Sequence, residues 1–320
     1  MTQSNAASAI DYDRPVLGIL LMLGFCVSAP AGDAFAKILG DRLPLLELVV
    51  VRFAAQVIIL LPIVMARSLP WRSSGRVFWL IVARTVLHVL GIGMMFSALR
   101  YLPLADAIAI AFVMPFIMLI LGRFVLNETV GKQRVIACTV GFIGTLLVVQ
   151  PSFARVGAPA LLPLGVAVDF ALFMLVTRQI ARKTDPVALQ AVSGGLALMI
   201  LMPLILLGVI APPENVIGDA ITFVAPSDAS TWGYLALIGI LGTIGHLLMT
   251  WSLRYAPSAT LAPMQYLEIP FATLIGWLLF RDLPNGLAAL GILITMAAGL
   301  YIIWREQANA RRSQVPLAEI

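Results

Sequence analysis

The residues of this sequence that could do chemistry are ionisable side chains inside long apolar stretches. Glu268 lies in the run LAPMQYLEIPFATLIGW, Asp169 lies in LLPLGVAVDFALFMLV, and His88 and His246 stand in two further runs of this kind. At the centre of a bilayer a charged side chain costs about 2.5–3.5 kcal/mol on insertion scales, so each needs a partner, a cavity or a function. A buried carboxylate can bind a proton or a cationic group, and an imidazole can donate or accept a hydrogen bond.

Two carboxylates are expected near the middle of their helices. Glu268 follows Gln265 and Tyr266 and precedes Pro270, a proline that removes a backbone donor and frees a carbonyl for use. We predict that Glu268 binds a proton or a cationic part of a substrate. The alternative is a protonated acid that is hydrogen-bonded within the packing. Asp169 is predicted to line a cavity, and its alternative is an internal salt bridge or a hydrogen bond to a neighbouring Ser or Thr.

Two histidines and one arginine form a second group of candidates. Arg84 stands one turn before His88 on the same predicted helix face, so the two could form a basic wall against an electron-rich substrate. The alternatives are a satisfied structural histidine and an arginine that snorkels to the membrane surface. His246 follows Gly242 and Gly245, small residues that allow another helix to approach closely. His246 is therefore a cavity candidate beside a packing surface.

The first apolar run is interrupted by Pro30 and by Asp33, which stands one turn before Lys37. Two interpretations stay open: an ion pair between Asp33 and Lys37 near the outer surface, or an outer gate that includes Asp33. Arg52 and Asp106 are expected near the outer interface, where a charge costs little, so structural roles are preferred for both.

The elements that position these residues are membrane helices. Hydrophobic residues make up 61% of the 320 residues and charged residues only 12%, which excludes a soluble globular domain. A bilayer core about 30 Å thick takes about 20 apolar residues per helix. The predicted spans are 15–39, 44–66, 77–99, 103–123, 131–150, 159–180, 187–210, 232–252, 257–280 and 285–304. The expected class is an all-α integral membrane protein with ten transmembrane helices.

Basic residues predict the orientation of the bundle, because short cytoplasmic loops retain Lys and Arg. Most of them fall on the side of the amino end, which includes the loop 67–76, whereas the loop 211–231 carries acidic residues only. We therefore expect a multi-pass membrane protein with cytoplasmic tails at 1–14 and 305–320. The pI of 9.6 reflects this orientation and gives no reason to invoke nucleic acid.

Nearly the same five-residue segment occurs at two junctions between predicted helices, as LRYLP ending at Pro103 and as LRYAP ending at Pro257. The same order continues downstream, since Pro115 in the fourth predicted helix answers Pro270 in the ninth. Each half, 15–151 and 159–304, is thus predicted to be a five-helix unit. Because five is odd, the second unit enters the membrane from the opposite side, which makes an inverted repeat.

The stretch SALRYLPLADAIAIAFVMPFIMLILGRFVLNETVGKQRVIACTVGFIGTLLVVQP resembles the EamA family of the drug/metabolite transporter superfamily. The second half repeats the pattern more loosely, from SLRYAPSATLAPMQYLEIPF onward. The resemblance implies ten helices in two inverted repeats and a cavity lined mainly by helices 1, 3, 4, 6, 8 and 9. PLADA and GDAFAKIL look most like the branch that contains bacterial riboflavin and S-adenosylmethionine transporters.

The function predicted on this basis is secondary transport of a small organic metabolite (riboflavin-like, S-adenosylmethionine-like or amino-acid-like) by alternating access around a midplane cavity. Pro30, Pro103, Pro115, Pro257 and Pro270 are the expected helix breaks and pivots. The expected partners are the substrate, the lipid bilayer and a coupling proton. Direction of transport and oligomeric state are left open.

An enzyme is the rival class, and the sequence lacks G-x-S-x-G, H-E-x-x-H and a phosphate-cradling glycine loop followed by Lys. Asp33 and Asp169 could evoke an intramembrane aspartyl protease, but their flanking residues do not match that pattern. No metal site and no cofactor is predicted. A lipid scramblase or a non-transporting sensor remains an alternative to a transporter.

Overall fold

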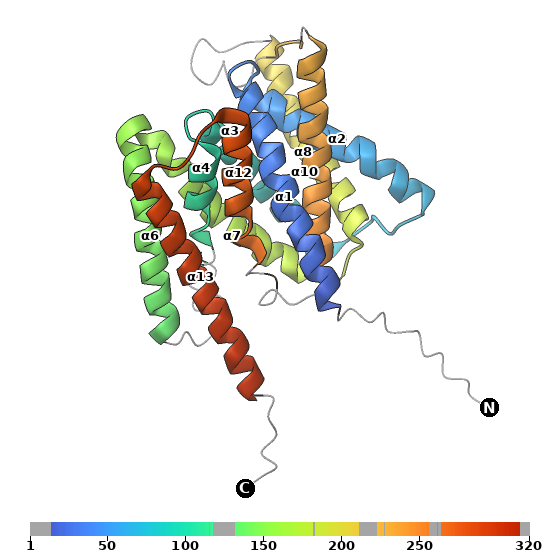
Figure 1. The fold of residues 1–320 in the computed structure, drawn as a ribbon. Helices are drawn as coiled ribbons and strands as arrows, with labels where there is room; N and C mark the ends of the chain where they lie inside the picture. Colours follow the sequence, from blue (N-terminus) through green and yellow to red (C-terminus); the bar gives the residue numbers. More distant parts are fainter. Residues whose placement is uncertain are drawn as a thin grey trace, which may run out of the picture.

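The computed structural model describes residues 14–114, 116–117, 132–181, 183–210, 223–226, 228–255, 261 and 264–313. These residues form α-helices, one short 3-10 helix and no strand (Figure 1). The helices are α1 (Pro15–Gly40), α2 (Leu45–Ala66), α3 (Gly75–Leu99), α4 (Leu104–Ala111), α6 (Lys132–Val156), α7 (Leu162–Ile180), α8 (Pro186–Ile210), α10 (Ala229–Tyr255), α12 (Glu268–Phe280) and α13 (Gly286–Ser313), with η1 (Ala158–Leu161) before α7.

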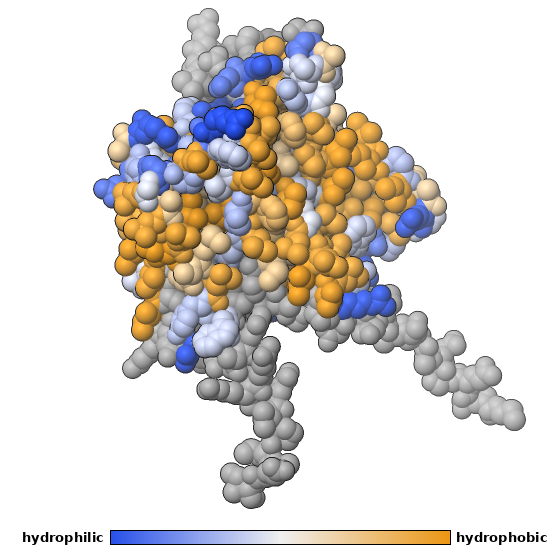
Figure 2. Space-filling model, viewed as in Figure 1, coloured by the Kyte–Doolittle hydropathy of each residue, from blue (hydrophilic) through white to orange (hydrophobic). Residues whose placement is uncertain are grey.

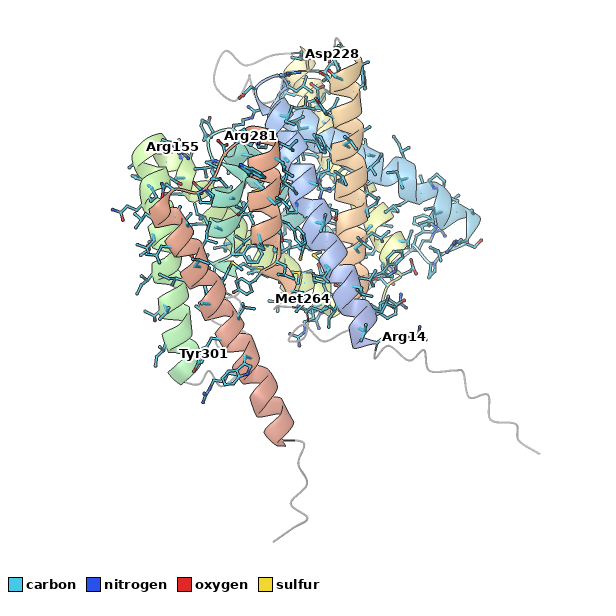
Figure 3. The ribbon with its side chains drawn as sticks, viewed as in Figure 1. Arg14, Arg155, Asp228, Met264, Arg281 and Tyr301 are labelled. Atoms are coloured by element: carbon cyan, nitrogen blue, oxygen red, sulfur yellow. The ribbon has the colours of Figure 1, made fainter. Side chains whose placement is uncertain are left out.

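The surface of the bundle is apolar where a soluble protein would be polar. Seven helices of the described part are long and apolar enough to cross a membrane. Large hydrophobic side chains such as Ile58, Met199 and Leu293 are more than 60% exposed. Figure 2 shows apolar side chains over the middle of the visible face, with hydrophilic ones near its upper and lower margins and at the far end of α2. Figure 3 places Arg155, Arg281 and Asp228 toward one end of the molecule and Arg14 toward the other. Such a surface is stable against lipid tails and would aggregate in water.

The fourth and ninth predicted helices differ from their expected form. Instead of one helix over 103–123, α4 ends at Ala111 and a turn follows at Phe112 and Val113. Instead of one helix over 257–280, a turn at Tyr266 and Leu267 precedes α12, which begins at Glu268. Continuous apolar character hides such breaks, because the bilayer demands hydrophobicity of helix and turn alike.

Three further boundaries differ in smaller ways. Helix α6 continues through Pro151 to Val156, beyond the predicted end at 150, and α13 continues to Ser313, beyond the predicted end at 304. Helix α1 is not interrupted at Pro30 but runs through it from Pro15 to Gly40. Of the expected pivots, Pro103 caps the start of α4, Pro270 lies in the first turn of α12, and Pro115 and Pro257 lie outside the described residues.

Long helices pack as antiparallel pairs (Figure 1). Helix α1 lies along α10, and the backbone N–H of Arg14, before α1, donates to the carbonyl of Tyr255, the last residue of α10, at 3.1 Å. Helix α3 lies along α7, α2 along α8, and α6 along α13. In the last pair Gly144 and Gly291 let the two backbones meet, because a Cβ on either glycine would lie within 3.0 Å of the other's carbonyl oxygen. Small residues of this kind make close helix contacts in membranes.

Side-chain caps hold several helix starts outside the apolar layer. Asp228 precedes α10 and accepts hydrogen bonds from the Ser230 hydroxyl, from the Thr231 hydroxyl at 2.7 Å and from the Thr231 backbone N–H at 3.1 Å. These bonds, that from Ser230 foremost, lower the pKa of Asp228 to about 2. Asp185 caps α8 and Asn285 caps α13 in the same way. Each cap satisfies backbone donors that the first helical turn leaves without a partner.

Lys37 ties α1 to the repeated junction. Its ammonium donates to the carbonyl oxygens of Leu99 at 2.9 Å and Leu102 at 2.6 Å, at the end of α3. It also lies over the Phe280 ring, 5.6 Å from the centroid. The ion pair between Asp33 and Lys37 is therefore wrong, since Lys37 instead satisfies carbonyls that a helix end leaves without donors.

Candidate functional site

A cavity of about 100 Å³ lies among the helices, smaller than the ~300–1,000 Å³ typical of small-molecule sites. Helices α1, α3, α4, α7, α10 and α12 contribute to its wall, as the resemblance implies, and α2 contributes Arg52 in addition. The polar side chains at the wall are Asp33, Arg52, His88, Asp169, His246, Gln265 and Glu268. Phe25, Phe96, Phe112, Phe170 and Phe173 supply aromatic surface.

Two of the cavity carboxylates come from α1 and α12. Asp33 follows Gly32, which lies against Leu241 and the backbone of Gly242. Because Gly32 has no side chain, α1 packs closely on α10 there. Glu268 is the first residue of α12 and directly follows the turn at Tyr266 and Leu267. Between the two helices the Cys26 thiol donates to the carbonyl of Met264, the labelled residue just below α12 in Figure 3, at 3.2 Å. That contact fixes the segment before Glu268 against α1.

Asp169 stands on α7 and faces α3. Its carboxylate fits against Gly91, where an added Cβ would collide with the Asp169 oxygen. Within the described part of the chain the carboxylate makes no hydrogen bond and no ion pair, so the predicted internal partner for Asp169 is not present there. Asp169 is 7% exposed, and that exposure is to the cavity that it lines. A carboxylate in this position is able to accept hydrogen bonds from a bound molecule.

Two imidazoles and a guanidinium make up the part of the wall formed by α2, α3 and α10. The rings of His88 and His246 lie 4.3 Å apart between centroids. One nitrogen of Arg52 lies 2.9 Å from Nδ1 of His246. Because a guanidinium is always a donor, His246 accepts this bond at Nδ1 and carries its own proton on Nε2. Neither ring nitrogen of His88 has a hydrogen-bond partner among the described residues.

Glycine on α10 makes room for Arg52. A Cβ at Gly242 would come within 3.0 Å of three guanidinium atoms, Nη1, Cζ and Nε. From the sequence, Arg52 is expected near the outer interface. In the structure its side chain is only 3% exposed and lies against α10 at the cavity. The depth expected for Arg52 stays a prediction, and the structure adds that its side chain lines the cavity. A charge within the apolar run VVVRFAAQVI was the available signal.

Arg84 does not reach the cavity. Its guanidinium is fully buried, donates to the hydroxyls of Thr177 and Ser193 at 3.0 Å each, and lies 4.6 Å from the Phe173 ring centroid. It neither snorkels to the surface nor joins His88 in a basic wall, because Phe173 lies against both side chains. Arg84 instead binds α3 to α7 and α8.

Tyr266 also stays out of the cavity wall. It is 1% exposed and packs against Phe112, with ring centroids 5.3 Å apart. Gln265, its neighbour, does line the cavity and is 5% exposed. Asp106 lies away from the cavity, where it accepts a hydrogen bond from Ser152 at 3.2 Å and lies 3.9 Å from Arg155. That arrangement fits the structural role expected for Asp106.

Apolar helices around a charged internal cavity define an integral membrane protein of the multi-pass helical class. Residues 16–150 and 158–305 each match the EamA-like transporter family, and the chain belongs to that family.

Curated relatives carry transporter names. A riboflavin transporter of Rhizobium johnstonii is 29% identical over 251 residues, which cover 76% of this chain and 73% of the relative. An S-adenosylmethionine uptake transporter of Rickettsia prowazekii is 26% identical over 293 residues, which cover 91% and 93%. A pseudopaline exporter of Pseudomonas aeruginosa is 24% identical over 282 residues, which cover 88% and 94%. A solved crystal structure covers 94% of this chain and 98% of its own, with a TM-score of 0.57 and 16% identity, and shows the fold alone.

Proposed function

We propose that this protein is a secondary transporter that moves a small organic metabolite across the bacterial inner membrane by alternating access around the cavity. The observation that carries the proposal is the cavity itself: three carboxylates, a guanidinium and two imidazoles surround it inside a bundle with an apolar exterior. Polar groups at that depth are costly unless they contact a substrate, an ion or water. The named activities of the relatives, with riboflavin and S-adenosylmethionine among their substrates, support the same class.

Equivalent contacts in the two halves support an inverted repeat. In the pair α1 and α10, Gly24 packs against Leu248, and in the pair α7 and α3, Gly165 packs against Met94. One turn further along, Ser28 lies against Gly245 in the first pair and Asp169 lies against Gly91 in the second. The sequence shift of 154 residues that aligns the junctions relates Met94 to Leu248 and Gly91 to Gly245. The same shift relates Gly141 on α6 to Thr295 on α13, and these two residues are joined by a hydrogen bond.

The two chain breaks fit the same relation. The turn at Phe112 and Val113 and the turn at Tyr266 and Leu267 fall at equivalent positions, and the Phe112 and Tyr266 rings contact each other. Broken helices near the midplane, at the contact between repeats, are a recurring site architecture in secondary transporters. We propose that the units rock about this contact and about the junctions at Pro103 and Pro257.

Glu268 is the proposed proton acceptor. It stands at the break in the second unit, whereas the equivalent position in the first unit is Met114, an apolar cavity residue. A carboxylate in one unit only suits a ligand that binds in one orientation. Proton coupling would link its protonation to which side of the membrane the cavity faces.

Flux into sealed proteoliposomes tests the proposal. Purified protein is reconstituted, and uptake of labelled riboflavin and labelled S-adenosylmethionine is measured with and without a pH gradient. We expect saturable flux of at least one compound without covalent change. Glu268→Gln should abolish flux or its pH dependence, whereas Arg72→Gln, a matched loss of charge at an exposed loop residue, should not.

Three outcomes would overturn parts of this proposal. Absence of solute flux together with movement of fluorescent lipid between leaflets would favour a scramblase. A chemically altered substrate would favour an enzyme. An unchanged pH profile in Glu268→Gln would remove the carboxylate from coupling while leaving transport intact.

Topology is tested separately by cysteine labelling. We propose that both termini and the loop 67–74 are cytoplasmic and that residues 223–228 face outward. A membrane-impermeant thiol reagent applied to intact cells should label Ser230→Cys and should not label Ser73→Cys. The reverse pattern would invert the orientation, and labelling of both from one side would contradict the inverted repeat.

A further inference from the structure

We propose that the cavity binds a zwitterionic metabolite, with the ligand carboxylate held at Arg52 and its cationic group held at Asp169. This inference rests on the proposed transport function and names the chemical class of its substrate. It is carried by two oppositely charged side chains of the wall that each lack the partner a folded protein normally supplies.

The donor pole is the guanidinium of Arg52. One terminal nitrogen is 2.9 Å from Nδ1 of His246, and the other, Nη1, is buried with no hydrogen-bond partner in the described part of the chain. Arg52 forms no ion pair with Asp33 there, although the two interact electrostatically across the wall. A buried donor left unpaired costs about 1–3 kcal/mol, and more when it is charged. A ligand carboxylate at Nη1 would remove that cost.

The packing around Arg52 holds the guanidinium in place for such a ligand. Gly242 leaves space for its flat face on α10, and His246 accepts from one edge. Nη1 is the guanidinium nitrogen that this packing leaves without a partner among the described residues, so the ligand carboxylate is placed there. His88, whose ring nitrogens have no partner among the described residues, stacks on His246 and adds a second group able to donate to the same carboxylate.

The acceptor pole is Asp169. Arg52 acts electrostatically on Asp33, but the structure gives Asp169 no hydrogen bond and no ion pair among the described residues. Gly91 lets α3 pass close to Oδ2 of Asp169, and the side chain lines the cavity beside that contact. A carboxylate that faces a cavity without a cation is an incomplete pair, and a ligand ammonium or sulfonium would complete it.

Aromatic surface joins the two poles. The rings of Phe170 and Phe173 stack at 5.6 Å with planes 14° apart, and Phe173 continues to His88 at 5.0 Å. A cation beside Asp169 would also lie close to these ring faces, which attract positive charge. A planar ring on the ligand could stack on the same surface, so the wall suits a ligand with an amino-acid head and an aromatic body.

Counting charges favours a ligand with net positive charge. Asp33, Asp169 and Glu268 are three acidic groups at the wall against one guanidinium, Arg52. A zwitterion with one additional cationic group would reduce the uncompensated negative charge of the wall when these carboxylates are ionised, whereas a neutral zwitterion would not. A dianion would face repulsion from all three.

The decisive experiment compares ligands that differ by one charged group. Binding to purified protein is measured by calorimetry for S-adenosylmethionine, for its decarboxylated form, which lacks the carboxylate, and for S-adenosylhomocysteine, which lacks the sulfonium charge. Riboflavin, which has neither group, is the fourth probe. The variants are Arg52→Gln, Arg52→Lys, Asp169→Asn and the exposed-loop control Arg72→Gln.

The expected pattern is selective. Arg52→Gln should weaken S-adenosylmethionine about 10-fold or more and should change the decarboxylated form by less than about threefold, since hydrogen bonds between charged groups are worth about 1.5–3 kcal/mol. Asp169→Asn should weaken both of these cations and affect S-adenosylhomocysteine less. Arg52→Lys keeps the charge and guards against misfolding, so it should retain more affinity than Arg52→Gln.

The proposal is overturned if Arg52→Gln lowers the affinity for all probes equally, because Arg52 would then be a structural partner of His246. It is also overturned if the wild type binds riboflavin and none of the three adenosyl compounds. If riboflavin is then still transported, the proposed transport function holds and only the proposed substrate class fails. If none of the four probes is transported, the proposed transport function itself is contradicted.

Discussion

Replacing Gly242 by Ala tests whether Arg52 is held where the structure places it. The added Cβ would lie 2.5 Å from Nη1 of Arg52 and 2.7 Å from Cζ, so the guanidinium or helix α10 must move. The matched control is Gly233→Ala in the same helix, because an added Cβ there meets nothing within 4 Å. Both substitutions exchange Gly for Ala within α10, so the helix-propensity gain of about 1 kcal/mol is common to them.

The magnitude follows from two losses at Gly242. Overpacking costs about 1–3 kcal/mol, and the displaced guanidinium loses its bond to His246, which is worth about 1.5–3 kcal/mol for a charged donor. After the propensity gain is subtracted, Gly242→Ala should be destabilised by about 1.5–5 kcal/mol. Gly233→Ala should be unchanged or more stable by up to about 1 kcal/mol.

The assay is thermal unfolding of the two variants and the wild type in the same detergent, followed by ligand binding. The midpoint for Gly242→Ala should fall by at least about 5 °C relative to Gly233→Ala. Equal midpoints for the two variants would refute the close contact between α10 and the guanidinium. A lower midpoint with unchanged affinity for S-adenosylmethionine would keep the contact and contradict the role of Arg52 in binding.

Three other predictions concern the ends and flank of the bundle. Lys37→Met removes both hydrogen bonds to the carbonyls that end α3, so amide hydrogen exchange at the α3–α4 connection should become faster; an unchanged rate would mean that the ammonium is not needed there. Asp228→Ala should lower the unfolding temperature at pH 7, and because the folded-state pKa of Asp228 is depressed to about 2, its difference from wild type should shrink as pH falls from about 4 toward 2. A constant difference over that range would contradict the capping role. Gly291→Leu should separate α6 from α13 by pressing on the carbonyl of Gly144 and lower stability, whereas Gly286→Ala has open space and should not.

The sequence predicts much of this fold because the bilayer imposes simple rules. Within the described residues, seven apolar runs correspond to helices long enough to span a membrane. Asp33, Asp169, His88, His246 and Glu268 reach one cavity, as the cost of intramembrane charge suggests. The position of each of these residues within its apolar run and its charge can both be read from the sequence. No other information is needed to predict that they face the cavity.

Arg52 lines the cavity, whereas Arg84 is buried away from it, and local sequence patterns predict neither arrangement. Depth counted along a straight helix places Arg52 near an interface, but α2 leans strongly against the other helices in Figure 1, so residue number is a poor measure of its depth. Glycines on α10 then decide where its charge lies. Arg84 lies away from the cavity because it donates hydrogen bonds to the hydroxyls of Thr177 and Ser193 on other helices. No local sequence pattern links these residues to Arg84.

The two helix breaks could have been inferred from the prolines, although hydropathy conceals them. A proline is tolerated in the first turn of a helix because the N–H it lacks has no partner there. Pro270 lies in the first turn of α12, directly after the break at Tyr266 and Leu267, and Pro115 stands just as close behind the break at Phe112 and Val113. Pro270 thus marks the start of a helix segment rather than a kink within a helix, and Pro115, at a nearly equivalent place in the duplicated sequence, lies outside the described residues. At the second break Tyr266 is buried inside the protein, Gln265 and Glu268 beside it line the cavity, and Leu267 is 37% exposed, so most of the broken backbone lies within protein, where it is tolerated.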